Sequence, residues 1–157
     1  MPRIRLETTI NAPIDIVFDL SRSIDLHTVS TEQTNEKAIA GKTSGLIGLG
    51  ESVTWRAKHL GFTQSLTSKV TDYKHPSFFA DEMVKGIFKR FRHEHHFETV
   101  GNQTLMTDIF EYRSPFGILG KLADFIFLKS YLHSFLKKRN TAIKEFAESD
   151  EWKKILK

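Results

Sequence analysis

The chain has 157 residues, no cysteine, and 23 Lys and Arg against 19 Asp and Glu, for a net charge of +4. This length supports one core without cross-links, and the lack of cysteine excludes disulfides, thiolate catalysis and cysteine-ligated metal centres. The basic residues are dispersed among acidic ones, and the longest apolar run is far too short for a bilayer. We therefore expect a single cytoplasmic domain over residues 1–157, with no cofactor, no nucleic-acid partner and no membrane insertion.

The first part of the chain predicts a strand followed by two short helices. Apolar and polar residues alternate over residues 4–10, which is typical of a half-buried strand. Pro13 then suits the first turn of a helix, and Val17 and Phe18 follow at helical spacing. Ser23 is a candidate cap for a second short helix that carries Leu26 as its inward residue.

Strand character dominates the middle of the chain. The predicted strands are residues 32–39, 51–60, 62–73, 78–85, 87–99 and 104–113, and turn signals rich in glycine, proline and asparagine separate them. Together with the first strand they make seven. Their short connections imply an antiparallel sheet.

The spacing of the apolar residues along the chain changes after a Ser114–Gly117 turn. From residue 118 to about 148 apolar residues recur at three- and four-residue steps, which predicts one long amphipathic helix. Its predicted apolar stripe is Leu122, Phe125, Leu128, Leu132, Phe135, Leu136, Ile143 and Phe146. The basic group 137–139 is interpreted as a solvated face. Such a sheet needs an apolar partner for its concave face, and only this helix is long enough to be one.

At this point the chain resembles the START-like, or SRPBCC, superfamily, which includes birch-allergen-like proteins and polyketide cyclases. The element order, the residue 10–14 sequence INAPI leading into a helix, and the long terminal helix carry the resemblance. GLGESVTWRA at 48–57, DEMVKG at 81–86 and HEHHF at 93–97 are similar to a bacterial branch of ligand-binding members whose activities are mostly unassigned. The resemblance implies an α+β helix-grip fold, with a curved seven-stranded sheet and a C-terminal helix around an internal cavity.

The alternation along each strand predicts which side chains line that cavity, because the more apolar face of each strand is expected to point inward. On this basis the sheet contributes Trp55, His59, Gln64, Phe79, Asp81, Met83, Phe91, His93, His95, Phe97, Asp108, Phe110 and Tyr112, and the helix contributes Leu132, Phe135 and Leu136. Apolar walls with a few convergent polar groups are typical of a small-molecule site.

The polar members of this set carry the chemical hypotheses. Buried carboxylates need partners, so Asp81 and Asp108 indicate hydrogen bonds to the histidines, to water or to a ligand. His93, Asp81 and Asp108 are the candidate catalytic residues. Two alternatives stay open: a purely structural network in a packed core, and a metal site in which His59 and either Asp81 or Asp108 join His93 and His95.

The leading functional hypothesis is a binding or carrier protein for a small hydrophobic or aromatic molecule. A polyketide cyclase or dehydratase-type enzyme, in which a pocket histidine and aspartate exchange protons with the ligand, is the alternative from another class. A protein-interaction module with a filled core is the third. The glycine-rich loop at residues 45–50 is interpreted as a mobile gate for ligand entry.

Overall fold

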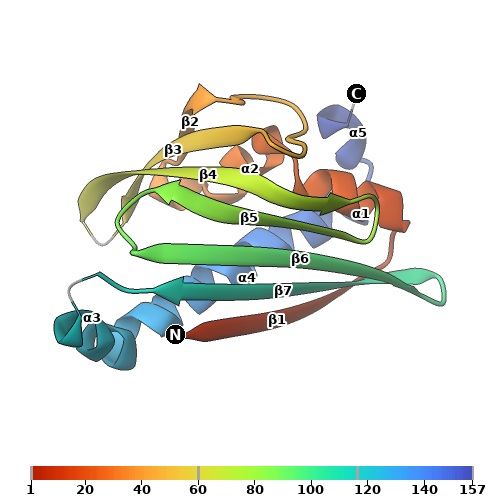
Figure 1. Cartoon of the computed structure of the whole chain (residues 1–157). Helices are drawn as coiled ribbons and strands as arrows, with labels where there is room; N and C mark the ends of the chain where they lie inside the picture. Colours follow the sequence, from red (N-terminus) through yellow and green to blue (C-terminus); the bar gives the residue numbers. More distant parts are fainter. Residues whose placement is uncertain (1, 60, 116, 157) are drawn as a thin grey trace.

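The computed structural model describes residues 2–59, 61–115 and 117–156. Within them, seven antiparallel strands form one curved sheet in the order β1-β7-β6-β5-β4-β3-β2 (Figure 1). The strands are β1 (Arg3–Ile10), β2 (Lys37–Gly41), β3 (Ser52–His59), β4 (Phe62–Lys74), β5 (Phe78–Lys85), β6 (Arg90–Val100) and β7 (Gln103–Arg113). The predicted antiparallel sheet is confirmed.

Two strands begin three or more residues later than predicted. Residues Glu32–Thr34 form a 3-10 turn, η1, and Asn35 adopts a left-handed backbone with φ of 52°, so β2 begins at Lys37 instead of residue 32. The sixth predicted strand begins at Arg90 and not at residue 87. Leu60, the predicted end of the third strand, lies outside the described residues.

The two predicted short helices are present as α1 (Ile14–Ser21) and α2 (Ile24–Ser30). Pro13 is the residue just before the first helix, and Ser23 caps the second by accepting a hydrogen bond from the backbone N–H of Leu26 at 3.1 Å. Each helix buries an apolar face, with Phe18 and Leu26 fully enclosed. These helices fill the end of the curved sheet nearest the C-terminus (Figure 1).

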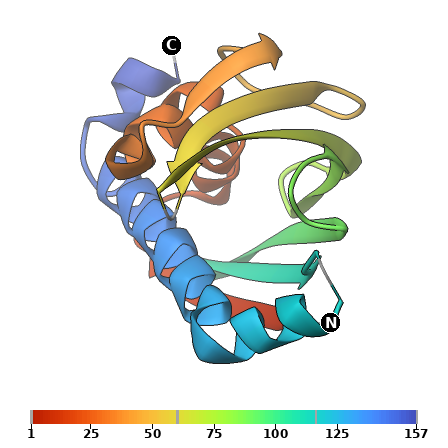
Figure 2. The same ribbon diagram turned by 90° about the vertical axis from the view of Figure 1, so that its left-hand side faces the viewer.

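The C-terminal helix is long, but it is not uniform. It comprises α3 (Ile118–Ala123), a π-helical segment η2 (Asp124–Leu128) and α4 (Lys129–Ala147), and the helix axis changes direction in this region (Figure 2). A π-helical turn adds a residue to the hydrogen-bonded ring and is a recognised cause of such a bend. A further short helix, α5 (Trp152–Ile155), was not predicted.

The sheet curls around α4, which supplies the apolar partner that the sequence predicted (Figure 2). Leu136 and Ile143 are buried against it. The predicted stripe fails before the bend: Leu122 is 54% exposed, because α3 projects beyond the edge of the helix–sheet contact. The side chain of Phe125, also predicted inward, lies outside the described part of the chain.

The loop at residues 45–50 is held in place at its start. The backbone N–H of Ile24 donates to the Gly45 carbonyl at 2.9 Å, and that of Ile47 donates to the Arg22 carbonyl at 3.2 Å. Ile47 is buried in a core cluster with Trp55. These contacts attach the loop to the α1–α2 connection, so the structure gives no support to the mobile-gate interpretation.

Candidate ligand-binding cavity

A cavity of about 420 Å³ lies between the concave face of the sheet and the C-terminal helix. Its size falls within the range of small-molecule sites. Twelve of the sixteen residues predicted to line it do so, namely Trp55, His59, Gln64, Phe79, Asp81, Phe91, His93, His95, Phe110, Leu132, Phe135 and Leu136. The alternation rule therefore brings most of the expected side chains together.

Four predicted lining residues are placed elsewhere. Asp108 and Tyr112 point to the concave side but are fully buried behind the cavity wall, because the helix and neighbouring side chains cover them. Phe97 belongs to the core cluster around Phe18, and Met83 packs at the margin of a second cluster. These four assignments to the cavity surface were wrong.

The walls are largely aromatic. Phe91 and Phe110, on neighbouring strands, stack with ring centres 5.3 Å apart. Phe79 stacks on His95 at 4.1 Å with the rings nearly parallel. Such walls favour flat, apolar ligands, since they provide broad contact area and bury apolar surface.

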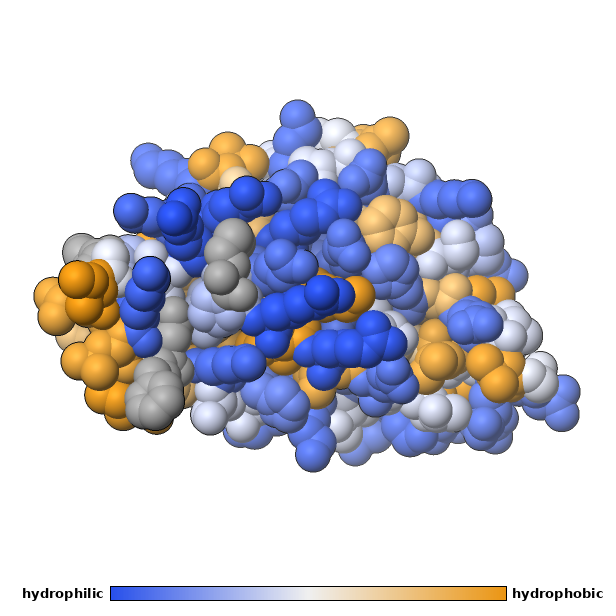
Figure 3. Space-filling view, turned by 60° about the horizontal axis from the view of Figure 1, so that its bottom comes forward, coloured by the Kyte–Doolittle hydropathy of each residue, from blue (hydrophilic) through white to orange (hydrophobic). Residues whose placement is uncertain are grey.

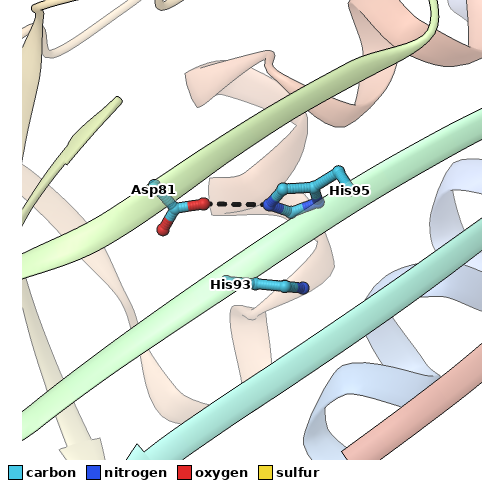
Figure 4. A group of neighbouring side chains, drawn as sticks. All are labelled: Asp81, His93 and His95. Atoms are coloured by element: carbon cyan, nitrogen blue, oxygen red, sulfur yellow. Dashed lines mark hydrogen bonds and ion pairs between the residues drawn. The ribbon is translucent and has the colours of Figure 1, made fainter. Parts of the chain in front are cut away.

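The strand register explains the polar centre of the cavity. Asp81 on β5 stands opposite His93 on β6, and His95 on β6 stands opposite Asp108 on β7. All four side chains share the concave face, so they meet (Figure 4 shows three of them). His95 Nε2 lies 2.9 Å from Asp81 Oδ1, and His93 Nε2 lies 2.8 Å from Asp108 Oδ1.

Helix α4 completes this network from the other side. Arg139 is 5% exposed and donates to Asp108 Oδ1 at 3.4 Å and to the Ser21 carbonyl at 3.1 Å. Asn140 donates to Asp108 Oδ2 at 2.8 Å. The interpretation of the basic group 137–139 as a solvated face is therefore wrong for Arg139, which is buried and lines the cavity.

The protonation states follow from these contacts. Burial, helped by repulsion from His95, lowers the pKa of His93 to about 4 against the opposing attraction of Asp108. Burial opposes the charged form of Asp108, but the hydrogen bond from His93, the nearby His95 ring and the charge of Arg139 outweigh it and hold its pKa well below the ordinary value. The pKa of Asp81 is lowered in the same way, with burial overcome by the His95 hydrogen bond.

Two hydrogen-bond acceptors of this network remain open toward the cavity. Asp108 is a carboxylate, so His93 must donate to it from Nε2, which leaves the lone pair on Nδ1. Within the described residues no hydrogen bond engages His93 Nδ1 or Asp81 Oδ2, although both residues line the cavity. These two atoms can therefore accept hydrogen bonds, and no donor of the described residues is bonded to them.

A second polar group lies at the Trp55 wall. His27 packs over Trp55 with ring centres 4.2 Å apart and lies 3.0 Å from Glu36 Oε1. Glu36 is buried, and its Oε2 has no hydrogen-bond partner among the described residues. Both side chains line the cavity.

A third polar contact links the sheet to the helix. His59 Nδ1 lies 2.7 Å from the Tyr131 hydroxyl. Burial lowers the pKa of His59 despite the opposing charge of Glu36, and burial raises the pKa of Tyr131. This contact joins β3 to α4 across one side of the cavity.

The metal hypothesis meets a partly suitable geometry. Asp81, His93 and His95 each offer a donor atom, and these atoms lie within 4.8 Å of one another. However, the Nε2 atoms of both histidines are already engaged by carboxylates. A cation at this position would therefore bind the atoms that are left free among the described residues, His93 Nδ1, His95 Nδ1 and Asp81 Oδ2, while the histidine–carboxylate bonds remain.

The cavity opens beside the bend in the C-terminal helix. Ile87, Leu119 and Phe127 line the cavity and are also 48%, 70% and 46% exposed. They come from the β5–β6 connection, α3 and η2. The opening is thus bordered by apolar side chains.

Lining residues that the sequence analysis did not name include His27, Glu36, Tyr131 and Arg139. Glu36 was assigned to a continuous strand, whereas the η1 turn reorients the chain just before it. Arg139 and Asn140 stand between Leu136 and Ile143 at core-facing helical spacing, which is a signal that could have been used.

The fold and the cavity define a helix-grip protein with an internal, mainly apolar cavity. The chain belongs to the family described as polyketide cyclase / dehydrase and lipid transport, whose model matches residues 10–129. A search of curated proteins found no match. No described helix is long and apolar enough to cross a membrane.

Solved structures of similar fold come from varied sources. A protein of Thermus thermophilus is 18% identical with a TM-score of 0.71, over 90% of this chain and 97% of that one. Ginseng major latex-like protein 151 from Panax ginseng is 17% identical with a TM-score of 0.69, over 94% and 98%. The ZhuI aromatase/cyclase from a Streptomyces species is 16% identical with a TM-score of 0.70, over 94% and 93%. At such identities these similarities establish the fold alone.

Proposed function

We propose that this protein binds a small, flat, largely apolar molecule that carries a hydrogen-bond donor such as a hydroxyl group, and holds it without chemical change. The observation that carries the proposal is the pair of open acceptors, Asp81 Oδ2 and His93 Nδ1, at the centre of an aromatic-walled cavity. Burying acceptors beside a ligand that cannot donate to them costs free energy. A donor on the ligand would remove that cost.

The state of His93 favours binding over proton transfer. A general base works best when its pKa lies near the working pH. The pKa of His93 is about 4, because the residue is buried beside His95. At neutral pH it is therefore a weak base that accepts a hydrogen bond from the ligand without taking the proton, which is the behaviour expected of a carrier and not of a cyclase.

The cavity itself also argues against the interaction module. That hypothesis requires a filled core, whereas about 420 Å³ of space is enclosed between the sheet and α4. The family description, with its cyclases and lipid transport, supports a role for that space in holding small molecules.

The proposal is tested with two aromatic probes that differ by one hydroxyl group, 2-naphthol and naphthalene. Trp55 lines the cavity, and the other tryptophan, Trp152, lies in α5 away from the lining, so a Trp152→Phe variant reports on the cavity through Trp55 alone. We expect 2-naphthol to bind at least about tenfold more tightly, since a hydrogen bond to a charged acceptor contributes about 1.5–3 kcal/mol.

Asp81→Asn provides the matched change at the site. The amide keeps an acceptor for His95 and presents a donor to the cavity, while His93 Nδ1 remains an acceptor, so the preference for 2-naphthol should be reduced and 2-acetylnaphthalene, which accepts a hydrogen bond, should gain affinity. Asp72→Asn is the control, since Asp72 pairs with Arg92 at 2.9 Å and is half exposed. Equal affinities for all three probes in the parent protein would contradict the proposal.

A further inference from the structure

Five large apolar side chains are exposed on one short stretch of helix. They are Ile118, Leu119, Leu122, Ile126 and Phe127, with exposed fractions of 84%, 70%, 54%, 64% and 46%. We call them the α3 patch. In Figure 3 they belong to the hydrophobic cluster at the left edge of the molecule.

The α3 patch has the pattern of a binding surface. Ile118, Leu122 and Ile126 are four residues apart and Leu119 lies three residues before Leu122, so these four share one side of the helix. Isolated apolar residues on a surface are ordinary, but a contiguous group of this kind marks an interaction site. This face belongs to the part of the C-terminal helix that projects past the sheet, and Ile118, Leu122 and Ile126 do not line the cavity, so neither the sheet contact nor the cavity requires these three residues to be apolar.

Five exposed cations lie on the C-terminal helix that carries the patch or at the strand end that leads into it: Lys89, Arg90, Arg113, Lys121 and Lys129. Lys121 and Lys129 belong to the same helical segment. Arg90 pairs with Arg113 in the β6–β7 ladder, and the backbone N–H of Lys89 donates to the Arg113 carbonyl at 2.9 Å, so the other three gather at the strand end next to α3.

These cations are not neutralised within the protein. Among the described residues no ion pair involves any of the five. Arg92, two residues beyond Arg90, contrasts with them because it bonds to Asp72, Glu82 and Glu94. Apolar side chains on a helix face with unpaired cations beside them are the composition of a helix that lies in the interface of an anionic bilayer.

We propose that the α3 patch docks the protein on the surface of an anionic lipid bilayer, with α3 and η2 lying in the interface and the five cations near the headgroups. A second copy of the chain fits this surface poorly, because two such faces would bring ten like charges together. A partner that is both apolar and negatively charged satisfies both features at once.

The docking surface and the cavity opening share residues. Leu119 and Phe127 belong to the α3 patch and also line the cavity. Docking therefore places the cavity opening against the lipid, where an apolar molecule could enter or leave without crossing water. The docking itself does not depend on what the cavity binds.

The test is flotation with phosphatidylcholine vesicles that contain about 30% phosphatidylserine, compared with phosphatidylcholine alone. We expect the protein to float with the anionic vesicles and to bind the neutral ones at least about tenfold more weakly. Leu122→Ser combined with Ile126→Ser should reduce binding to the anionic vesicles by at least about tenfold. Both residues lie outside the cavity lining, so the affinity for 2-naphthol measured without vesicles should be unchanged.

Val29→Ser combined with Val100→Ser is the matched control, since these residues are 49% and 52% exposed on other elements. It should float like the parent protein. The proposal is overturned if the parent protein fails to float with anionic vesicles, or if the α3 double variant floats as well as the control. It is also overturned if the α3 double variant loses self-association, measured by light scattering, without losing vesicle binding.

Discussion

Replacing Arg139 with methionine is expected to lower the free energy of unfolding by about 3–5 kcal/mol, the range seen when one partner of a buried ion pair is removed. Arg139 is 5% exposed and lies 3.4 Å from Asp108, which is itself 1% exposed. Methionine fills similar space but leaves the Asp108 charge without its cationic partner, and it leaves the Ser21 carbonyl without a donor. Urea unfolding followed by circular dichroism measures the change.

The comparison that isolates the charge is a double-mutant cycle. Asp108→Asn combined with Arg139→Met removes both charges, so its effect should be smaller than the sum of the two single changes. Lys153→Met, which breaks an exposed pair with Asp150, should cost no more than about 1 kcal/mol. If Arg139→Met lowers the free energy of unfolding no more than Lys153→Met does, the buried network is not a stabilising feature of the fold.

The architecture was predictable because sheet alternation and helical periodicity are local properties of the sequence. Val53, Trp55 and Ala57 are buried on one face of β3, as alternation predicts. The same rule placed Asp81, His93 and His95 on the concave face of two neighbouring strands. The alternation rule could not distinguish side chains that reach the cavity from side chains that lie behind its wall, such as Asp108. Whether a side chain reaches the cavity depends on which neighbouring residues cover it.

The errors arose where the environment of an element, and not its own pattern, decides burial. Leu122 continues the apolar period of the C-terminal helix, yet the sheet ends before it and leaves it 54% exposed. Phe62 is likewise apolar, yet it is 70% exposed at the start of β4. Arg139 shows the opposite error. Its charge was assumed to be solvated, but the side chain is buried and pairs with the carboxylate of Asp108 on a distant strand.

Acidification from pH 6.5 to pH 4 is expected to destabilise the protein by roughly 3 kcal/mol through His93 alone. The pKa of His93 falls from its ordinary 6.5 to about 4 in the folded protein, chiefly because the residue is buried. Between these two values the unfolded chain binds a proton that the folded chain does not, so lowering the pH favours unfolding. The contribution is fully present above pH 6.5 and is lost as the pH falls toward 4.

The measurement is the free energy of unfolding at a series of pH values for the parent protein and for His93→Gln. Glutamine can still donate to Asp108 but does not titrate, so the variant should show a much flatter profile between pH 6.5 and pH 4. His133→Gln, at an exposed position on α4, should retain the parent slope. Below pH 4 all three proteins should lose further stability, because Asp81 and Asp108 have lowered pKa values in the fold and protonate more readily when unfolded. Identical slopes for the parent and His93→Gln above pH 4 would mean that His93 is solvated in the folded protein, and that its Nδ1 is not the buried acceptor on which ligand selection rests.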